Sequence, residues 1–390
     1  MANKIIIAGS GGIGRACGLI LLEHFGRDID LVMADVDAMQ CEHAVSWINA
    51  GLTAPHSIQT TVLSADRLDN WNPEGQILLD CTPGKYAPAL ARVALRNQLH
   101  YANLTEHVPS TRLIYELAKD AGTGFALQMG LAPGFINLLA LKSAEEFTQF
   151  HPEYTLDRIR MRVGSLSQYA SSPSFYAFVW SPMGVSTEYL NESEIINNYQ
   201  KEIKPSLTGR ETIVINGTVY EADFTSGGAA DLPDYYNGQI RELNYKTLRY
   251  PGHFDYIIKI KNELGDDLSK GSLLDRMMQD IPSQDQDRVL IYCSVSGTNQ
   301  DKKRFEKIYS REIHPVRLGS ITLTAIQRTT ASALAQTAAL LLSNRYKGIL
   351  TQSKYPVDEF LNGEIVLRHY GDFFDGHLQK QPADATNGFH

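Results

Sequence analysis

Three glycines with the spacing G-x-G-x-x-G lie near the start of the sequence, at Gly9, Gly11 and Gly14. A short apolar run precedes them, and an apolar pattern of helical period follows. In this arrangement the first glycine permits a tight turn, the second lets the backbone approach a pyrophosphate, and the third lets helix and strand pack closely. The N-terminus of the following helix offers free N–H groups to the phosphates. The loop, including Gly12 and Ile13, therefore predicts a dinucleotide-binding site; a glycine-rich turn without a ligand is the alternative.

Asp35 ends the next apolar run, about 20 residues after the last glycine of the loop. At this position a carboxylate accepts hydrogen bonds from the hydroxyl groups of the adenosine ribose. It would repel a 2′-phosphate, and the residues that follow directly, 36–39, contain no lysine or arginine. The sequence therefore favours NAD over NADP.

Further candidates follow the later strands that the sequence predicts. Ala65 and Asp66 come after the strand expected at residues 57–63, where we expect the adenine ring; a helix N-cap is the alternative for Asp66. Thr82 and Pro83 follow a buried strand and are expected beside the middle of the dinucleotide.

A turn-rich loop at residues 129–135 leaves the nucleotide-binding part of the chain. Gly130 and Ala132 lie in this loop, which we expect at the nicotinamide end of the cofactor. Asn137 lies at the start of the apolar helix that follows and is a candidate partner of the nicotinamide amide.

These residues need a scaffold in which strands alternate with helices, and the first 130 residues supply that pattern. Such alternation is typical of a doubly wound, parallel α/β sheet. We expect strands at 5–8, 31–34, 57–63, 76–80, 100–104 and 124–128, and helices at about 37–49, 88–97 and 111–121.

From residue 155 the pattern becomes strand-rich, with a hairpin predicted at the Asn216-Gly217 turn because that pair tolerates positive φ at both positions. A long apolar helix at about 325–344 is expected to be buried and to pack back on the first domain. The last dozen residues, 379–390, look frayed. The strands expected here are 158–163, 211–215, 218–221, 256–261, 288–296 and one near Ile321.

Composition restricts the class of protein. A net charge of −8 and the lack of a Lys/Arg block argue against a nucleic-acid-binding protein. The apolar run 331–342 is too short to span a bilayer. The four cysteines are scattered without a C-x-x-C pair, so neither a zinc site nor a disulfide framework is expected. A strand beginning within four residues of the start leaves no room for a signal peptide, and we expect a cytoplasmic protein.

Several motifs together resemble the saccharopine dehydrogenase and lysine 6-dehydrogenase superfamily. The resemblance implies a Rossmann domain at 1–130, a second α/β domain with a mixed sheet at 131–320, and a helix and tail at 321–378 that return to the first domain. It also implies an NAD(P)-linked enzyme that oxidises or reduces a carbon–nitrogen bond of an amino-acid-derived substrate. Besides the glycine loop, the motifs are His100-Tyr101-Ala102-Asn103-Leu104-Thr105-Glu106, Gly130-Leu131-Ala132-Pro133-Gly134, Trp180-Ser181-Pro182-Met183-Gly184, Thr225-Ser226-Gly227-Gly228 and Lys246-Thr247-Leu248-Arg249-Tyr250-Pro251-Gly252-His253.

Two positions depart from the family pattern. Saccharopine reductases tend to carry Asp where this chain has Ala132, which is more similar to the lysine 6-dehydrogenase branch. Relatives often read Tyr-Val-Asp-Leu where this chain has Asn103 in place of the Asp. The resemblance therefore indicates the superfamily better than the substrate.

Chemistry on a carbon–nitrogen bond, which the resemblance implies, needs groups that bind a carboxylate and groups that transfer a proton. Arg249 is the candidate for binding a substrate carboxylate, because its guanidinium offers a planar pair of donors; a structural ion pair is the alternative. His253 and Glu106 are the candidate acid–base groups, against a histidine that shapes its turn and a solvated loop carboxylate. Trp180, Ser181 and Tyr101 are candidates for contact with the substrate, although a core position is the alternative for Tyr101 and a buried structural indole the alternative for Trp180.

Two other functions stay open. One is a carboxynorspermidine dehydrogenase-type enzyme of polyamine synthesis, against which Asp35 counts mildly because that branch typically uses NADP. The other is a catalytically silent dinucleotide-binding protein, suggested by Asn103 and Ala132. For the leading function we expect a small-molecule amino-acid substrate, no metal and a homodimer.

Overall fold

The strand β1 (Asn3–Ala8) forms the centre of a seven-stranded sheet in the computed structural model, which describes residues 2–106 and 108–374. The frayed tail expected at 379–390 lies outside the described residues. By their internal contacts the described residues form two units: unit 1 runs to Phe135 and resumes at Pro315–Gly371, and unit 2 holds Ile136–His314 and the residues from Asp372 onward.

The sheet of unit 1 is parallel throughout and has the strand order β17-β6-β5-β4-β1-β2-β3. Ile5 to Ala8 are fully or almost fully buried, as expected for a strand with both faces of its sheet covered. The predicted doubly wound parallel sheet is confirmed, and β17 is a strand that the sequence pattern did not predict. The strands are β2 (Ile29–Asp35), β3 (Gln59–Val62), β4 (Ile77–Asp80), β5 (His100–Asn103), β6 (Gly124–Ala126) and β17 (Gly348–Leu350).

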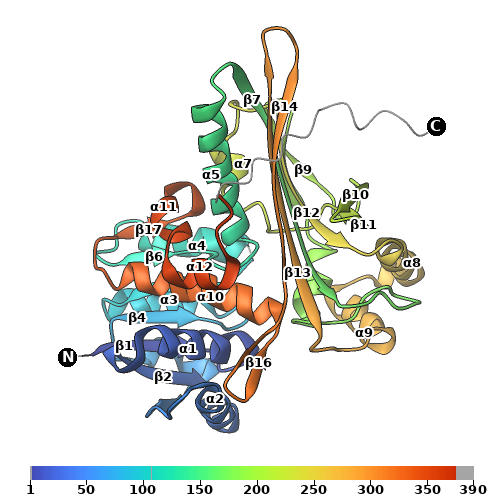
Figure 1. The fold of residues 1–390 in the computed structure, drawn as a ribbon. Helices are drawn as coiled ribbons and strands as arrows, with labels where there is room; N and C mark the ends of the chain where they lie inside the picture. The colour runs from blue at the N-terminus through green and yellow to red at the C-terminus, as the bar shows by residue number, and fades with distance from the viewer. Residues whose placement is uncertain (1, 107, 375–390) are drawn as a thin grey trace. The chain divides into compact units, whose positions relative to one another are not determined.

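Helices surround this sheet within unit 1 (Figure 1). The late helix α10 packs against α1 and α12, which confirms the prediction that it returns to the first domain. A small hairpin, β15 (Val316–Leu318) and β16 (Ile321–Leu323), precedes α10. The helices are α1 (Gly12–Phe25), α2 (Ala38–Gly51), α3 (Ala87–Arg96), α4 (Val108–Ala118), α10 (Ala325–Leu341), α11 (Val357–Leu361) and α12 (Glu364–Tyr370).

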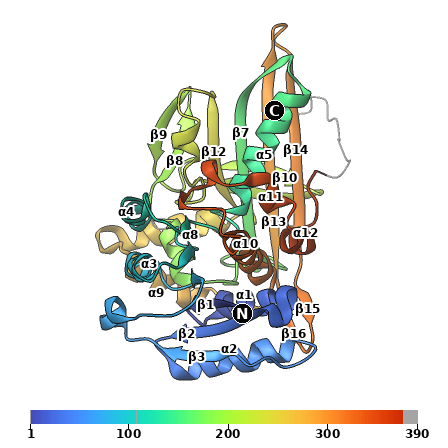
Figure 2. The same ribbon diagram turned by 90° about the vertical axis from the view of Figure 1, so that its left-hand side faces the viewer.

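Unit 2 is built on an eight-stranded sheet whose central path is β10-β11-β12-β7-β13-β14. Strands β12 and β7 are parallel and the remaining pairs are antiparallel, so the predicted mixed sheet is confirmed. The long strands β7, β13 and β14 run side by side (Figure 2). The strands are β7 (Tyr154–Ser167), β8 (Ser193–Asn197), β9 (Gln200–Lys204), β10 (Glu211–Ile215), β11 (Thr218–Asp223), β12 (Glu242–Arg249), β13 (Asp287–Asn299) and β14 (Arg304–Ile313).

The predicted hairpin between β10 and β11 is confirmed, since Asn216 and Gly217 have φ of 50° and 79°. The strand expected at 256–261 is wrong, because these residues lie inside the helix α8 (His253–Leu264). The buried side chains of α8 include Phe254, Ile257 and Ile260, a spacing of three that fits a helix.

The other helices of unit 2 are α5 (Phe135–Phe150), whose first residue belongs to unit 1, α6 (Pro182–Glu188), α7 (Leu232–Tyr235) and α9 (Lys270–Asp280). A core of apolar side chains from α6, α8 and α9 supports one part of the unit. Among the described residues, no helix combines the length and the apolar character needed to cross a membrane.

Candidate functional site

A cavity of about 200 Å³ opens in unit 1 beside the glycine loop. Its lining combines backbone from the loop, the carboxylate of Asp35 and a set of apolar side chains, and the apolar part suits the adenosine of a dinucleotide. The lining residues are Gly9, Gly11, Asp35, Val36, Leu63, Ala65, Leu68, Cys81, Thr82, Pro83, Tyr86 and Leu90.

The glycine loop has the geometry that phosphate binding requires. Gly9 has φ of +94°, and a Cβ on Gly14 would lie 1.8 Å from the carbonyl oxygen of Gly9, so neither position accepts a larger residue without strain. A Cβ on Gly11 would meet nothing within 4 Å, which leaves open space at the N-cap of α1. Because α1 has neither a side-chain cap nor an acidic residue in its first turn, its N-terminus is available to an anion.

Asp35 lies at the end of β2 and lines the same cavity. Its carboxylate accepts hydrogen bonds from the backbone N–H of Ser10, at 2.7 Å, and of Asp37, at 3.3 Å. These contacts tie the carboxylate to the glycine loop and hold a negative charge at the wall of the cavity.

Of the other residues predicted to contact the cofactor, Ala65, Thr82 and Pro83 line this cavity. Gly12, Ile13 and Gly14 form the first turn of α1. Asp66 is exposed in the short 3-10 helix Ala65–Asn70, where Ser64 occupies the N-cap position, so the alternative N-cap role of Asp66 is wrong.

Gly130 and Ala132 lie in a tight loop of unit 1. The N–H of Gly130 donates to the carbonyl of Pro133 at 3.0 Å, and the N–H of Phe135 donates to the carbonyl of Gly130 at 2.8 Å. Gly134 has φ of +126°, and a Cβ there would lie 2.2 Å from the carbonyl oxygen of Gly130. Neither Gly130 nor Ala132 lines the cavity described above, and their contact with the cofactor stays a prediction.

Two other predicted residues of unit 1 lie near the end of β5. Glu106 is half-buried in the segment that follows this strand. Tyr101 is fully buried, and its hydroxyl donates to Asp80 at 2.7 Å. The position of Tyr101 fits the core interpretation better than contact with a substrate.

In unit 2, Arg249 ends β12 with only 1% of its surface exposed. Its Nε donates to the hydroxyl of Tyr189 at 2.9 Å, and its Nη1 donates to the carbonyl of Leu248 at 2.9 Å. The guanidinium also lies over the ring of Tyr176, 4.7 Å from its centroid. The third nitrogen, Nη2, faces a carboxylate oxygen of Glu188 at 3.5 Å.

Glu188 is one of the side chains that contact Arg249, and the sequence did not predict a role for it. It is the last residue of α6, and the described structure gives its Oε2 no hydrogen-bond partner beyond the long ion pair with Arg249. Burial raises the pKa of Glu188 above its ordinary value, although the charge of Arg249 opposes that shift. The sequence pattern of strands and turns does not predict the contact between Glu188 and Arg249, because this contact forms only when the fold brings α6 beside β12.

His253 begins α8, directly after the turn in which Gly252 has φ of +93°. Its Nδ1 lies 2.7 Å from the carbonyl oxygen of Ser174, which can only accept, so Nδ1 carries the proton. Its Nε2 then accepts from the hydroxyl of Tyr189 at 2.9 Å. Burial, together with the charge of Arg249, lowers the pKa of His253 to about 3. This neutral, doubly bonded imidazole fits the interpretation of a histidine that shapes its turn better than that of an acid–base group.

Trp180 and Ser181 precede α6. The Trp180 ring lies against Gly184, where a Cβ would come within 2.3 Å of the indole, and the Ser181 hydroxyl caps α6 by accepting from Gly184. Asn137 is fully buried in α5, and its amide nitrogen donates to the carbonyl of Gly228 at 3.0 Å. The predicted contacts of these three residues with substrate or cofactor stay predictions.

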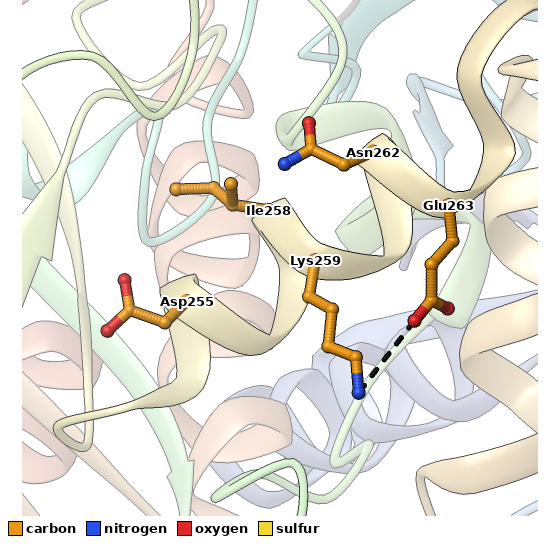
Figure 3. A pocket seen from close by; sticks show the side chains of 5 residues that line it. All are labelled: Asp255, Ile258, Lys259, Asn262 and Glu263. Atoms are coloured by element: carbon orange, nitrogen blue, oxygen red, sulfur yellow. Dashed lines mark ion pairs between the residues drawn. The ribbon is translucent and has the colours of Figure 1, made fainter.

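A second hollow lies on the outer face of α8 (Figure 3). All of its lining side chains come from this one helix, so it has no opposing wall, and an ion pair of 3.7 Å joins Lys259 to Glu263 across it. Within residues 2–106 and 108–374, no three His, Cys, Asp or Glu side chains are grouped as metal ligands would be. The lining residues are Asp255, Ile258, Lys259, Asn262 and Glu263.

Two family models match the chain. The saccharopine dehydrogenase NADP binding domain matches residues 5–123, and the saccharopine dehydrogenase C-terminal domain matches residues 130–365.

Two solved structures are similar to this chain over nearly their whole length. One is apo saccharopine dehydrogenase (L-Glu forming) from Saccharomyces cerevisiae, with 15% identity, a TM-score of 0.73, and coverage of 97% of this chain and 99% of that one. The other is homospermidine synthase from Legionella pneumophila in complex with NAD, with 12% identity, a TM-score of 0.66, and coverage of 99% and 96%. At these identities the likeness shows the fold.

Proposed function

The chain belongs to the saccharopine dehydrogenase family, and on that premise we propose that it is an NAD-linked oxidoreductase acting on the CH–NH group of an amino-acid-derived substrate. The observation that carries this proposal is the cavity of unit 1, in which an open glycine loop, the fixed carboxylate of Asp35 and an apolar wall come together. When bound, the nicotinamide cofactor supplies hydride acceptance or donation at the carbon that bears the nitrogen.

The residues present fit that cofactor. The open N-terminus of α1 at Gly11 is suited to the pyrophosphate, and the apolar side chains Leu63 and Leu90 are suited to the adenine ring. We propose NAD rather than NADP because the carboxylate of Asp35 would accept from ribose hydroxyls and repel a 2′-phosphate. Among residues 2–106 and 108–374, no lysine or arginine side chain lines the cavity to offset that repulsion.

We propose that Arg249 and Glu188 together recognise the charged end of an amino acid. The Nε and Nη1 of Arg249 are held by Tyr189 and Leu248, so the guanidinium keeps its orientation while Nη2 exchanges its partner. A substrate carboxylate would replace the oxygen of Glu188 that now lies 3.5 Å from Nη2. A cation and an anion side by side complement an α-carboxylate and its ammonium group.

The amine of the substrate must lose a proton before hydride can leave its carbon. A carboxylate whose pKa is raised toward neutrality accepts such a proton well at ordinary pH. In unit 2 Glu188 has this property, whereas the pKa of His253 is lowered to about 3 and both of its ring nitrogens are bonded. We therefore propose Glu188 as the proton acceptor in unit 2 and retain Glu106 as the candidate in unit 1.

The test is a substrate panel followed by absorbance of the reduced cofactor. We expect NAD⁺ to be reduced with lysine or saccharopine, at a rate that falls at least tenfold in Glu188→Gln while NAD⁺ affinity is unchanged. Turnover with carboxynorspermidine alone would favour the polyamine function. Normal NAD⁺ binding without turnover of any substrate would favour a catalytically silent protein.

A further inference from the structure

Asp80 is a buried carboxylate at the end of β4, next to the cofactor cavity but not itself part of the lining. Its Oδ1 accepts from the backbone N–H of Thr82 at 2.9 Å and from the Thr82 hydroxyl at 2.6 Å. Its Oδ2 accepts from the hydroxyl of Tyr101 at 2.7 Å. Both donor groups of Thr82 are therefore fixed by one carboxylate, and Thr82 lines the cavity.

The same network continues on the far side of Tyr101. The amide nitrogen of Asn103 donates to the Tyr101 hydroxyl at 3.4 Å, and its Oδ1 accepts from the backbone N–H of Gln128 at 2.8 Å. The carbonyl of Asn103 accepts from the N–H of Met129 at 2.8 Å. Gln128 has φ of 61°, an unfavourable conformation for a residue with a side chain, so these bonds hold the start of the loop at residues 129–134.

Burying the ionised carboxylate of Asp80 costs free energy of folding. Burial raises the pKa of Asp80 to about 6, although the hydrogen bonds from Thr82 and Tyr101 lower it. The titratable groups nearby are Tyr101 of β5, Cys81 of the same loop and Cys17 of α1, and burial raises the pKa of each, which keeps all three neutral. No lysine or arginine among the described residues pairs with Asp80, so desolvation is offset by hydrogen bonds alone.

We propose that Asp80 is a positioning residue for the dinucleotide: its carboxylate fixes Thr82, and with it the wall from Cys81 to Pro83, while Tyr101 and Asn103 connect that wall to the loop after β6. This inference rests on the proposed function, because the position of Thr82 affects binding only if a dinucleotide occupies the cavity.

The departure from the family pattern at position 103 has a physical reason in this network. Asn103 donates to Tyr101 and accepts from Gln128, whereas an ionised Asp could only accept. An Asp at this position would also place a second negative charge beside the buried carboxylate and favour its protonated form. Asn103 therefore allows Asp80 to remain ionised near neutral pH.

The experiment measures the Kd for NAD⁺ by calorimetry from pH 5 to pH 8 on the whole chain. For the unaltered protein we expect affinity to fall severalfold as pH decreases through about 6, because protonation of Asp80 weakens its hold on Thr82. Asp80→Asn should raise the Kd about tenfold at pH 8 and abolish the pH dependence. Thr82→Val should raise the Kd about threefold.

Asn103→Asp provides the readout that a merely structural role would not change. It should shift the pH at which affinity falls upward by about one pH unit or more while leaving affinity at pH 8 closer to that of the unaltered protein than Asp80→Asn does. Asp30→Asn is the matched control, because Asp30 is an exposed residue of the same sheet near the opposite end of β2. It should change neither the Kd for NAD⁺ nor the dependence of that Kd on pH.

A flat pH profile in the unaltered protein, or equal affinity in folded Asp80→Asn and the unaltered protein, would overturn the inference and leave the proposed function intact. If Asp80→Asn does not fold, the pH dependence of the Kd for NAD⁺ in the unaltered protein and in Asn103→Asp still tests the inference. Absence of NAD⁺ binding by the unaltered protein would contradict the proposed function and this inference with it.

Discussion

The guanidinium of Arg249 is oriented before any ligand arrives, because Tyr189, Leu248 and the ring of Tyr176 hold three sides of it. A lysine ammonium at this position would be a point charge without the fixed planar geometry. The fixed guanidinium of Arg249 orients its Nη2, and the proposed binding of a substrate carboxylate depends on that orientation.

Arg249→Lys should therefore raise KM for a carboxylate-bearing substrate at least tenfold, a loss of about 1.4 kcal/mol, and leave the Kd for NAD⁺ unchanged. Steady-state kinetics and calorimetry measure the two quantities. Arg162→Lys is the matched control, because Arg162 is equally buried in the sheet of unit 2 but pairs with Glu211. Equal effects on substrate and cofactor in Arg249→Lys would remove this residue from the substrate site.

His253 offers a prediction on stability. Its pKa is about 3 in the folded protein against 6.5 unfolded, so the unfolded chain takes up the proton first as pH falls. The stability it contributes is complete above pH 6.5 and is lost as pH falls toward 3. Urea unfolding should show a loss on the order of 2 kcal/mol between pH 7 and pH 5 from this residue.

His253→Gln keeps a donor and an acceptor but cannot take up a proton, so its free energy of unfolding should depend less on pH over that interval. We also expect its kcat to fall less than tenfold. If kcat falls a hundredfold in His253→Gln while its free energy of unfolding depends on pH as in the unaltered protein, His253 would again be the candidate acid–base group.

Among the residues of the candidate site, those that the sequence could predict belong to local motifs. Gly9, Gly11 and Asp35 line one cavity because a strand, a tight turn and a helix follow each other directly in the chain. Glu188 and Asp80 could not be predicted in this way. Their environment comes from contacts with residues distant in sequence, such as Arg249 and Tyr101, and burial then changes their chemistry.

At the level of elements, short buried strands and the Asn-Gly turn carry unambiguous local signals, which is why unit 1 and the hairpin β10–β11 could be predicted. The segment 256–261 could not, because its run Ile258-Lys259-Ile260-Lys261 alternates like a strand. Burial of Phe254, Ile257 and Ile260 against α6 and α9 decides in favour of the helix α8. Tertiary packing here overrides the local pattern.

The helix α10 depends on a well-formed N-terminus. The hydroxyl of Thr324 accepts from the N–H of Gln327, and the side chain of Gln327 accepts from the N–H of Thr324, which makes a complete capping box. Thr324→Ala should lower the free energy of unfolding by about 1 kcal/mol, as measured by urea denaturation. Thr322→Ala, in the exposed part of β16, is the control. An unchanged midpoint in Thr324→Ala would show that the packing of α10 alone determines its stability.

At the level of the whole molecule, each of the two units has its own hydrophobic core. A ligand that binds only the folded form of unit 1 stabilises that unit by mass action, by about 2.7 kcal/mol at a concentration one hundred times Kd. Hydrogen exchange should therefore slow on NAD⁺ addition in β1, α1 and the strand ends of unit 1, with little change in β10 and β11. Equal slowing throughout the chain would contradict binding in the cavity of unit 1.

The sequence also led us to expect a homodimer, and this stays a prediction for sizing experiments. The family and the two-unit architecture followed from motifs spread along the chain, whereas the substrate did not. Its recognition depends on how individual side chains are paired, and Arg249 is an example, since only the fold shows that its partner is Glu188.

The proposed binding of NAD in the cavity of unit 1 is tested by a calorimetric titration of the protein with NAD⁺ and NADP⁺, repeated on Asp35→Ala. We predict that NAD⁺ binds at least tenfold more tightly than NADP⁺, and that Asp35→Ala weakens NAD⁺ binding and narrows the difference. Failure of both dinucleotides to bind, or a preference for NADP⁺ that Asp35→Ala leaves unchanged, would contradict it.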